Sequence, residues 1–153
     1  MSLDEKIPGL TNGRSPLPWL VTAGQPSLNQ IEAAQAAGVT MIIDLRDPME
    51  ERPFHEPEEA ARLGIEYVNV PVSLGSLDEE KLDRILAALR SNAGQPTMLH
   101  CASANRVGGA LIPYFILDEG MDRQQAVDLA TKVGLRSAEL MEWGLDYAAK
   151  RGS

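Results

Sequence analysis

The sequence predicts an α/β fold with a mostly parallel central sheet and helices on both faces. Short apolar runs typical of strands alternate with stretches of helical periodicity, and a helical tail follows. This alternation is typical of parallel strands joined by crossover helices. The 153 residues, of which 44% are hydrophobic, are enough to build one domain with a real core. We therefore expect a single domain over residues 1–153, in which residues 1–18 form an extended lead-in.

The first half of the chain predicts two strands with a helix between them. Residues 7–19 are rich in proline and glycine and lack periodicity, which is typical of an extended segment. Residues 20–23 form a short apolar strand. Ser27 and Gln30 have the spacing of a capping box, so a helix is expected to begin there. Residues 39–45 form a nearly continuous apolar run, as expected of a strand covered on both faces.

The second half predicts two more strands and five helices. Residues 47–57 contain three prolines and are expected to be irregular. The alternating elements that follow are a helix over 58–63, a strand over 65–70, a helix over 76–92 and a strand over 97–100. The helix over 76–92 is the best defined, because its apolar residues repeat at helical spacing. Three further helices are expected over 107–118, 123–133 and 137–150.

The single cysteine lies between a predicted strand and a predicted helix, in the segment His100-Cys101-Ala102-Ser103-Ala104-Asn105-Arg106. This order predicts a strand, a tight loop and a helix, with a thiol at the start of the loop and a guanidinium group at its end. The backbone N–H groups of such a loop converge on one point, and the helix N-terminus adds partial positive charge there. The residues from Ala102 to Arg106 are therefore predicted to bind an oxyanion, and the same field favours the thiolate of Cys101.

This segment resembles the signature of cysteine-dependent phosphatases of the dual-specificity and protein-tyrosine type, which is His-Cys, five residues and then Arg. Here four residues separate Cys101 from Arg106. Loops of that length also occur in rhodanese-like sulfurtransferases and in a bacterial phosphatase-like family whose domain is also found fused to beta-lactamase-like hydrolases. The last family is the most similar, because the chain also has its Gly-Gln-Pro element at 24–26 and its Ile-Asp-Leu-Arg strand at 43–46.

The resemblance implies a cysteine-phosphatase-like fold and a hydrolase that acts on a phosphate monoester. Cys101 would be the nucleophile and would form a phosphocysteine intermediate, and Arg106 would bind two phosphate oxygens as a bidentate fork. His100 would orient the cysteine segment. Two residues depart from the pattern of these phosphatases. Ala104 replaces a usual glycine and should resist a left-handed backbone, and Val107 replaces a common Ser or Thr.

The general acid is the least defined part of the predicted site. The resemblance places it in the loop after the third predicted strand, where Asp78 is the nearest aspartate. Asp78 also lies in a capping-box pattern, Ser76 to Glu79, at the start of a predicted helix. Asp44 and Asp47 are the alternatives.

Two other functions are open at this point. The short loop favours a rhodanese-like sulfurtransferase in which Cys101 carries a persulfide. Ala104 and Val107 favour an anion-binding module without catalytic activity. His100 and the Gly-Gln-Pro element favour the phosphatase.

Composition narrows the range of partners. The net charge of −8 and the lack of clustered Lys and Arg in the sequence argue against nucleic acid and anionic membranes. The expected partner is a small anionic or phosphorylated substrate. One cysteine excludes an intramolecular disulfide framework, and no leader or long apolar segment is evident, so a cytoplasmic location is expected. No cofactor or metal is expected, and the sequence does not indicate an oligomeric state.

Overall fold

A five-stranded sheet forms the centre of the molecule. The computed structural model describes residues 1–152, and its strands lie in the order β1-β2-β5-β3-β4. The strands are β1 (Arg14–Leu17), β2 (Leu20–Ala23), β3 (Met41–Asp44), β4 (Glu66–Asn69) and β5 (Thr97–His100). All neighbouring pairs are parallel except β1 and β2, which are antiparallel. The predicted α/β fold with a mostly parallel sheet is confirmed.

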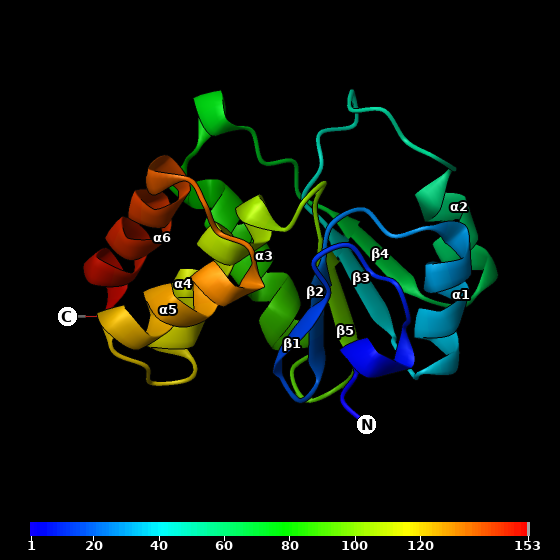
Figure 1. Ribbon diagram of the computed structural model, residues 1–153. Coiled ribbons are helices and arrows are strands. Elements are labelled where there is room, and N and C mark those ends of the chain that lie inside the picture. Colours follow the sequence, from blue (N-terminus) through cyan, green and yellow to red (C-terminus); the bar gives the residue numbers. More distant parts are fainter. Residues whose placement is uncertain (153) are drawn as a thin grey trace.

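Helices cover both faces of this sheet. The α-helices are α1 (Leu28–Ala36), α2 (Glu56–Arg62), α3 (Glu79–Ser91), α4 (Asn105–Leu117), α5 (Arg123–Val133) and α6 (Ala138–Arg151). In Figure 1, α1 and α2 lie on one side of the sheet and α3 to α6 on the other. Two separate apolar clusters fill the spaces between the sheet and these two helical layers. No helix within residues 1–152 is both long enough and apolar enough to span a bilayer.

Helix α4 is the buried centre of the larger helical layer, and it fixes the position of the loop that precedes it. Its residues from Val107 to Phe115 are all buried. It packs closely against α6, where an added Cβ at Gly144 would collide with the backbone of Gly109. Because β5 and α4 are both buried, the loop between them is held at both ends.

The lead-in is more structured than the sequence predicts. Residues 1–18 contain a short 3-10 helix, η1 (Asp4–Lys6), and the edge strand β1. Strand β1 pairs with β2, with Arg14 opposite Thr22 and Leu17 opposite Leu20. An edge strand tolerates Pro16, because a proline there removes no hydrogen bond from the sheet interior.

Two helix starts also differ from their predicted positions. Asp78 is the N-cap of α3 and accepts a hydrogen bond from the Lys81 backbone N–H, whereas Ser76 lies in the 3-10 helix η2 (Leu74–Ser76). The Ser76 to Glu79 capping box is therefore wrong, and α3 begins at Glu79. Helix α2 begins two residues earlier than predicted, at Glu56, because a proline is tolerated in the first turn of a helix.

Candidate active site

The carboxyl ends of the parallel strands form one row at the edge of the sheet. The register places Ala23 opposite His100, His100 opposite Asp44, and Asp44 opposite Asn69. Ligands of open α/β sheets bind beyond this end of the strands. Cys101 directly follows β5, which lies between β2 and β3, so the predicted loop occupies the centre of the row.

Cys101 is buried at the start of the loop. Its backbone N–H donates to the carbonyl of Ala23 at 3.3 Å. Its Sγ accepts a hydrogen bond from the backbone N–H of Ala104 at 3.1 Å, and such a bond becomes stronger when the sulfur is ionised. Ala104 adopts the left-handed conformation, with φ 75°, that an alanine was expected to resist. That conformation costs about 1–2 kcal/mol for a residue with a side chain.

A glycine on the opposite side makes room for the Ala104 side chain. Gly134 lies between α5 and α6, and a Cβ built on it would be 2.9 Å from the Ala104 Cβ. The same segment is bound to the loop by Asn105, whose Oδ1 accepts from the backbone N–H groups of Arg136 at 2.7 Å and Ser137 at 3.3 Å. The chain thus accommodates an alanine in the loop through the residue that faces it.

The Gly-Gln-Pro element supports the outer side of the loop. The Gln25 backbone N–H donates to the carbonyl of Ala102 at 3.0 Å, and the Asn12 side chain donates to the carbonyl of Ser103 at 2.9 Å. At Gly24, an added Cβ would lie 2.5 Å from the Ala102 carbonyl oxygen, so only glycine permits this approach. The carbonyl groups of the loop are therefore engaged from outside.

Apart from that of Ala104, which donates to Cys101 Sγ, the backbone N–H groups of residues 102–106 have no acceptor among the described residues. These are the N–H groups of Ala102, Ser103, Asn105 and Arg106. The last two begin α4, where N–H groups have no partner within the helix. Unpaired donors in a tight loop at a helix N-terminus are a typical cradle for an oxyanion.

Arg106 is paired with a carboxylate of its own chain. Its Nη1 and Nη2 donate to the two oxygens of Glu50, at 2.7 Å and 2.9 Å, and Nη1 also donates to the carbonyl of Val72 at 3.1 Å. These hydrogen bonds lower the pKa of Glu50 to about 2. The pKa of Arg106 is raised, mainly by its hydrogen bonds to Glu50. Burial acts in the opposite direction, and the charge of Cys101 adds to the increase. The bidentate fork predicted for phosphate therefore holds Glu50.

A second guanidinium group lies beside the same carboxylate. Arg46, at the end of β3, is buried and donates to the side-chain carbonyl of Gln25 and to the backbone carbonyl of Glu51. Its Nε has no hydrogen-bond partner among the described residues and lies 3.8 Å from an oxygen of Glu50. Two arginines thus converge on one carboxylate next to the loop.

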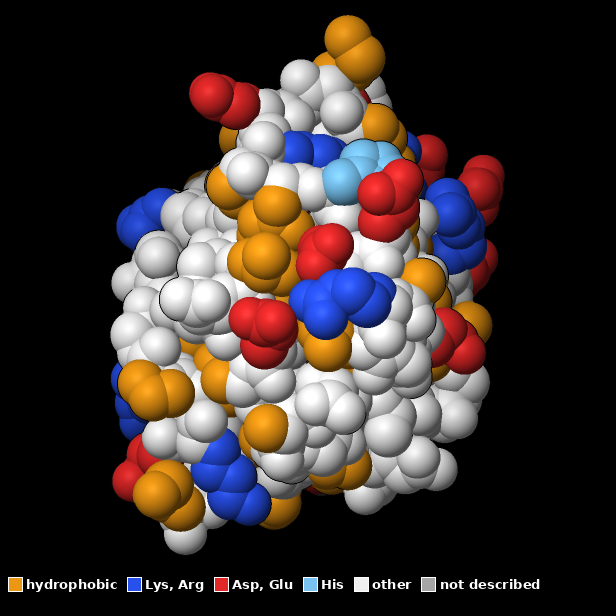
Figure 2. Space-filling view, turned by 90° about the vertical axis from the view of Figure 1, so that its right-hand side faces the viewer, with side chains coloured by type: hydrophobic (Ala, Val, Ile, Leu, Met, Phe, Trp, Pro, Cys, Tyr) orange, Lys and Arg blue, Asp and Glu red, His pale blue; other side chains and the backbone are white. Residues whose placement is uncertain are grey.

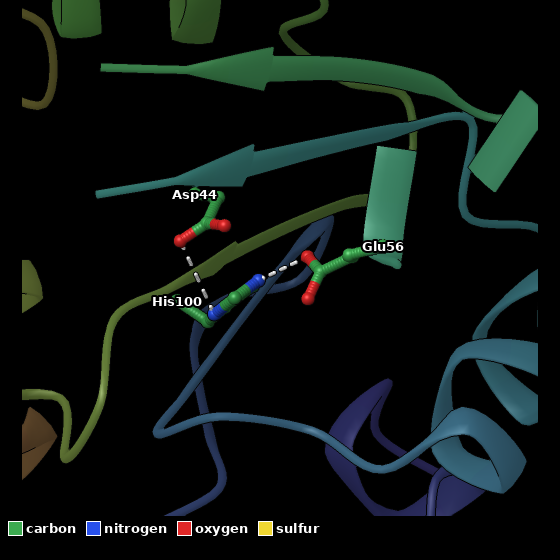
Figure 3. A group of neighbouring side chains, drawn as sticks. All are labelled: Asp44, Glu56 and His100. Atoms are coloured by element: carbon green, nitrogen blue, oxygen red, sulfur yellow. Dashed lines mark hydrogen bonds and ion pairs between the residues drawn. The ribbon is translucent and has the colours of Figure 1, made fainter. Parts of the chain in front are cut away.

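His100 belongs to a buried network behind the cysteine. In Figure 3 its ring lies between the carboxylates of Asp44 and Glu56, with Nε2 at 2.5 Å from Glu56 and Nδ1 at 3.8 Å from Asp44. Nδ1 also lies 3.3 Å from the carbonyl oxygen of Cys101. Burial lowers the pKa of His100, but the hydrogen bond and charge of Glu56, together with Asp44, outweigh burial and raise it. His100 thus lies directly behind the cysteine segment, and its role in orienting that segment stays a prediction.

The two carboxylates of the network have further partners. Glu56 accepts from the Gln25 side chain at 2.9 Å, and Asp44 accepts from the Tyr67 hydroxyl at 2.6 Å. Asp44, Glu56 and His100 bring one potential metal-ligand atom each within 4.8 Å of the others. All three are hydrogen bonded within the protein, and the His100 ring reaches the carbonyl of Cys101, so the network contacts the cysteine segment directly.

The candidate acids lie in different surroundings. Asp78 is exposed, and the bond from the Lys81 backbone N–H lowers its pKa, whereas burial raises it slightly. Its hydrogen bonds are made with Lys81 and Trp143, and none joins it to the cysteine loop. Asp44 is buried in the His100 network. Asp47 follows Arg46 and lies 3.5 Å from the Ser73 hydroxyl.

The fold is shared with solved structures, although no protein-family model and no curated protein matches the sequence. A DUF442 protein from Shewanella putrefaciens CN-32 is 22% identical, with a TM-score of 0.78 over 95% of this chain and 97% of that one. Tk-PTP in its active form is 15% identical, with a TM-score of 0.80 over 91% and 97%. TpbA from P. aeruginosa is 19% identical, with a TM-score of 0.71 over 95% and 86%. These proteins have the fold of PTP-like cysteine phosphatases, which confirms the predicted fold.

Proposed function

We propose that the protein is a cysteine-dependent phosphatase that hydrolyses phosphate monoesters at the Cys101 loop. One observation carries the proposal: one short loop holds a buried thiol, the Arg106 guanidinium and four backbone N–H groups that find no acceptor within residues 1–152. The shared fold supports it, and one related structure is a complex of TpbA with pTyr.

The proposed reaction has two steps. The Cys101 thiolate attacks phosphorus in line, so that an S–P bond forms as the ester O–P bond breaks and the leaving oxygen takes a proton. The free loop N–H groups and the Arg106 fork stabilise the charge on the phosphoryl oxygens. Water then attacks the phosphocysteine, the S–P bond breaks, and inorganic phosphate and the thiolate are released. Arg106 must exchange Glu50 for the phosphate before the first step.

Asp78 is retained as the proposed general acid for poor leaving groups. Asp78→Asn tests this role without removing the helix cap, since Asn is as good an N-cap as Asp. Hydrolysis of alkyl phosphates should slow about 100-fold or more, whereas aryl phosphates with good leaving groups should be nearly unaffected. Equal rates of alkyl phosphate hydrolysis in the parent and the variant would remove Asp78 from the mechanism.

The main experiment measures hydrolysis of an aryl phosphate by the parent, Cys101→Ser and Arg106→Lys. Cys101→Ser should abolish hydrolysis, because a serine hydroxyl in the same place stays protonated. Arg106→Lys should reduce it strongly, because lysine has no planar fork. A parallel assay offers thiosulfate and cyanide and measures thiocyanate.

The second candidate, a sulfurtransferase, rests on the four-residue loop. Thiocyanate formation that requires Cys101, with aryl phosphate left intact, would replace the phosphatase proposal with this one. If neither reaction requires Cys101, both enzymatic proposals fail and an anion-binding module is left.

A further inference from the structure

A groove lined by basic and neutral side chains lies next to the cysteine loop. It has a volume of about 290 Å³, and its charged residues are Arg14, Lys132 and Arg136, accompanied by Asn12. Arg14 comes from β1, Lys132 from the last turn of α5 and Arg136 from the segment between α5 and α6. Arg14 is distant in sequence from Lys132 and Arg136, so the fold brings together three cations that form no single basic cluster in the sequence.

These cations are not neutralised by the protein. Within residues 1–152 none of the three forms an ion pair, whereas Arg62 pairs with Glu32 and Glu59. Figure 2 shows the face that carries α1 and α2, where acidic and basic side chains lie interspersed. The chain has 22 acidic and 14 basic residues, so a groove whose charged residues are all cations departs from its average surface. Lys132 also interacts favourably with the end of its helix, but this accounts for only one of the three charges.

Residues that line the groove are hydrogen bonded to the anion loop. Arg136 Nη2 donates to the Ser103 hydroxyl at 3.2 Å, and the Asn12 side chain donates to the Ser103 carbonyl at 2.9 Å. Gly134, which lines the groove, faces Ala104. The groove therefore borders the loop that holds Cys101.

We propose that this basic groove, formed by Arg14, Lys132 and Arg136, binds a second phosphate group of the substrate. The preferred substrates are then small molecules with two or more phosphate groups, a specificity that rests on the proposed phosphatase function. A phosphate group carries close to two negative charges and several acceptor oxygens, which match guanidinium donors. The net charge of −8 repels a long acidic polypeptide, whereas a compact ligand within the groove contacts mainly cations.

The test measures binding to the Cys101→Ser protein, which cannot form the phosphocysteine. Inorganic phosphate, pyrophosphate and tripolyphosphate are titrated by calorimetry at about 0.15 M salt, where the Debye length is about 8 Å. Affinity should rise along this series, and tripolyphosphate should bind at least about tenfold more tightly than phosphate. Adding Arg14→Gln or Lys132→Gln should remove most of this preference and weaken tripolyphosphate much more than inorganic phosphate.

Arg123→Gln is the matched control. It removes one charge from the same helix as Lys132, roughly 14 Å away along the axis, and should keep the preference. Equal affinities for phosphate and tripolyphosphate would overturn the proposal. An equal loss of tripolyphosphate affinity in Arg123→Gln and Lys132→Gln would also overturn it, because net charge alone would then explain binding.

Aryl phosphate hydrolysis by the parent, compared with that by Cys101→Ser, separates the groove proposal from the phosphatase proposal on which it rests. If hydrolysis does not require Cys101 but tripolyphosphate binds through Lys132, the phosphatase proposal fails and the groove is supported. If hydrolysis requires Cys101 and the preference is absent, only the groove proposal fails.

Discussion

Two ion pairs, each with one carboxylate, flank Cys101, and they differ in how deeply they are buried. His100 precedes the cysteine and pairs with Glu56; the side chains are 0% and 2% exposed. Arg106 closes the loop and pairs with Glu50; these side chains are 16% and 32% exposed. A buried pair is costly to break, whereas a pair in contact with solvent can exchange partners. We therefore expect the buried pair of His100 and Glu56 to hold the loop, and Arg106 to exchange Glu50 for an anion when one binds.

The neighbours of each pair support this difference. Glu56 opens α2 and is also bound by Gln25. Glu50 lies in the segment between β3 and α2, next to Met49, which is 91% exposed. Glu50 thus belongs to a more exposed part of the chain than Glu56.

The largest expected effect is on stability when the buried pair is broken. Glu56→Ala leaves His100 without its main partner in the protein interior and should lower the free energy of unfolding by about 3–5 kcal/mol. Urea denaturation measures this change. Glu58→Ala is the control, because that side chain is 76% exposed. A loss below about 1 kcal/mol in Glu56→Ala would mean that the pair is not a scaffold.

The loop between the two pairs depends on Gly24. Gly24→Ala places a Cβ against the Ala102 carbonyl and should lower stability by about 1–3 kcal/mol, together with a clear loss of anion affinity. Gly75→Ala is the matched control, because nothing lies within 4 Å of a Cβ at Gly75. Unfolding and vanadate inhibition measured on both variants test the prediction. Equal effects in the two variants would contradict it.

Breaking the pair of Arg106 and Glu50 should raise anion affinity, in contrast to the loss expected for Gly24→Ala. Glu50→Gln removes the negative charge that competes with an anion for the Arg106 fork, so vanadate should bind about tenfold more tightly, while stability changes by less than about 1 kcal/mol. Inhibition of aryl phosphate hydrolysis by vanadate gives the affinity. Glu51→Gln removes a neighbouring charge and should have little effect. Weaker vanadate binding in Glu50→Gln would show instead that Glu50 positions Arg106.

The smallest expected effect is a difference in pH dependence. The pKa of Glu50 is lowered to about 2 in the folded protein, so its contribution is complete above its ordinary value and is lost as the pH falls toward 2. The advantage of the parent over Glu50→Gln in unfolding free energy should therefore be constant from pH 5 to 7 and shrink by pH 3, by less than about 1 kcal/mol. The same advantage at pH 3 and pH 7 would contradict the assignment.

The stability that His100 contributes to the buried pair is lost at alkaline pH, whereas that of Glu50 is lost in acid. The raised pKa of His100 means that its contribution is present below its ordinary value and is lost as the pH rises through the raised one. The lowered pKa of Glu56 adds a loss in acid. Comparison of the parent with Glu56→Ala across alkaline pH separates this behaviour from that of Glu50.

Local signals allowed most of the fold to be predicted. The apolar runs of the parallel strands are visible in the sequence, and the Ser27 and Gln30 capping box is present at α1. Strand β1 was missed because it is a short edge strand that contains Pro16. The cap of α3 was misplaced because Ser76 and Asp78 both carry capping side chains, and only the backbone conformation selects Asp78.

The candidate site could be predicted only where its residues are close in sequence. Cys101 and Arg106 were identified because one loop carries both. Glu50 and Glu56 were missed, since they lie 56 and 44 residues from the side chains they bind. The acidic residues in the segment that follows the Ile-Asp-Leu-Arg strand are a signal that could have pointed to them.

The position of β5 has a consequence for folding. Thr97 pairs with both Leu20 and Met41, so the strand that leads to Cys101 inserts between two strands that precede it by roughly fifty to eighty residues. Such long-range parallel pairing forms late and slowly. The cysteine loop can therefore form only after the central strand has docked, and a chain that is partly synthesised or partly folded would lack this loop.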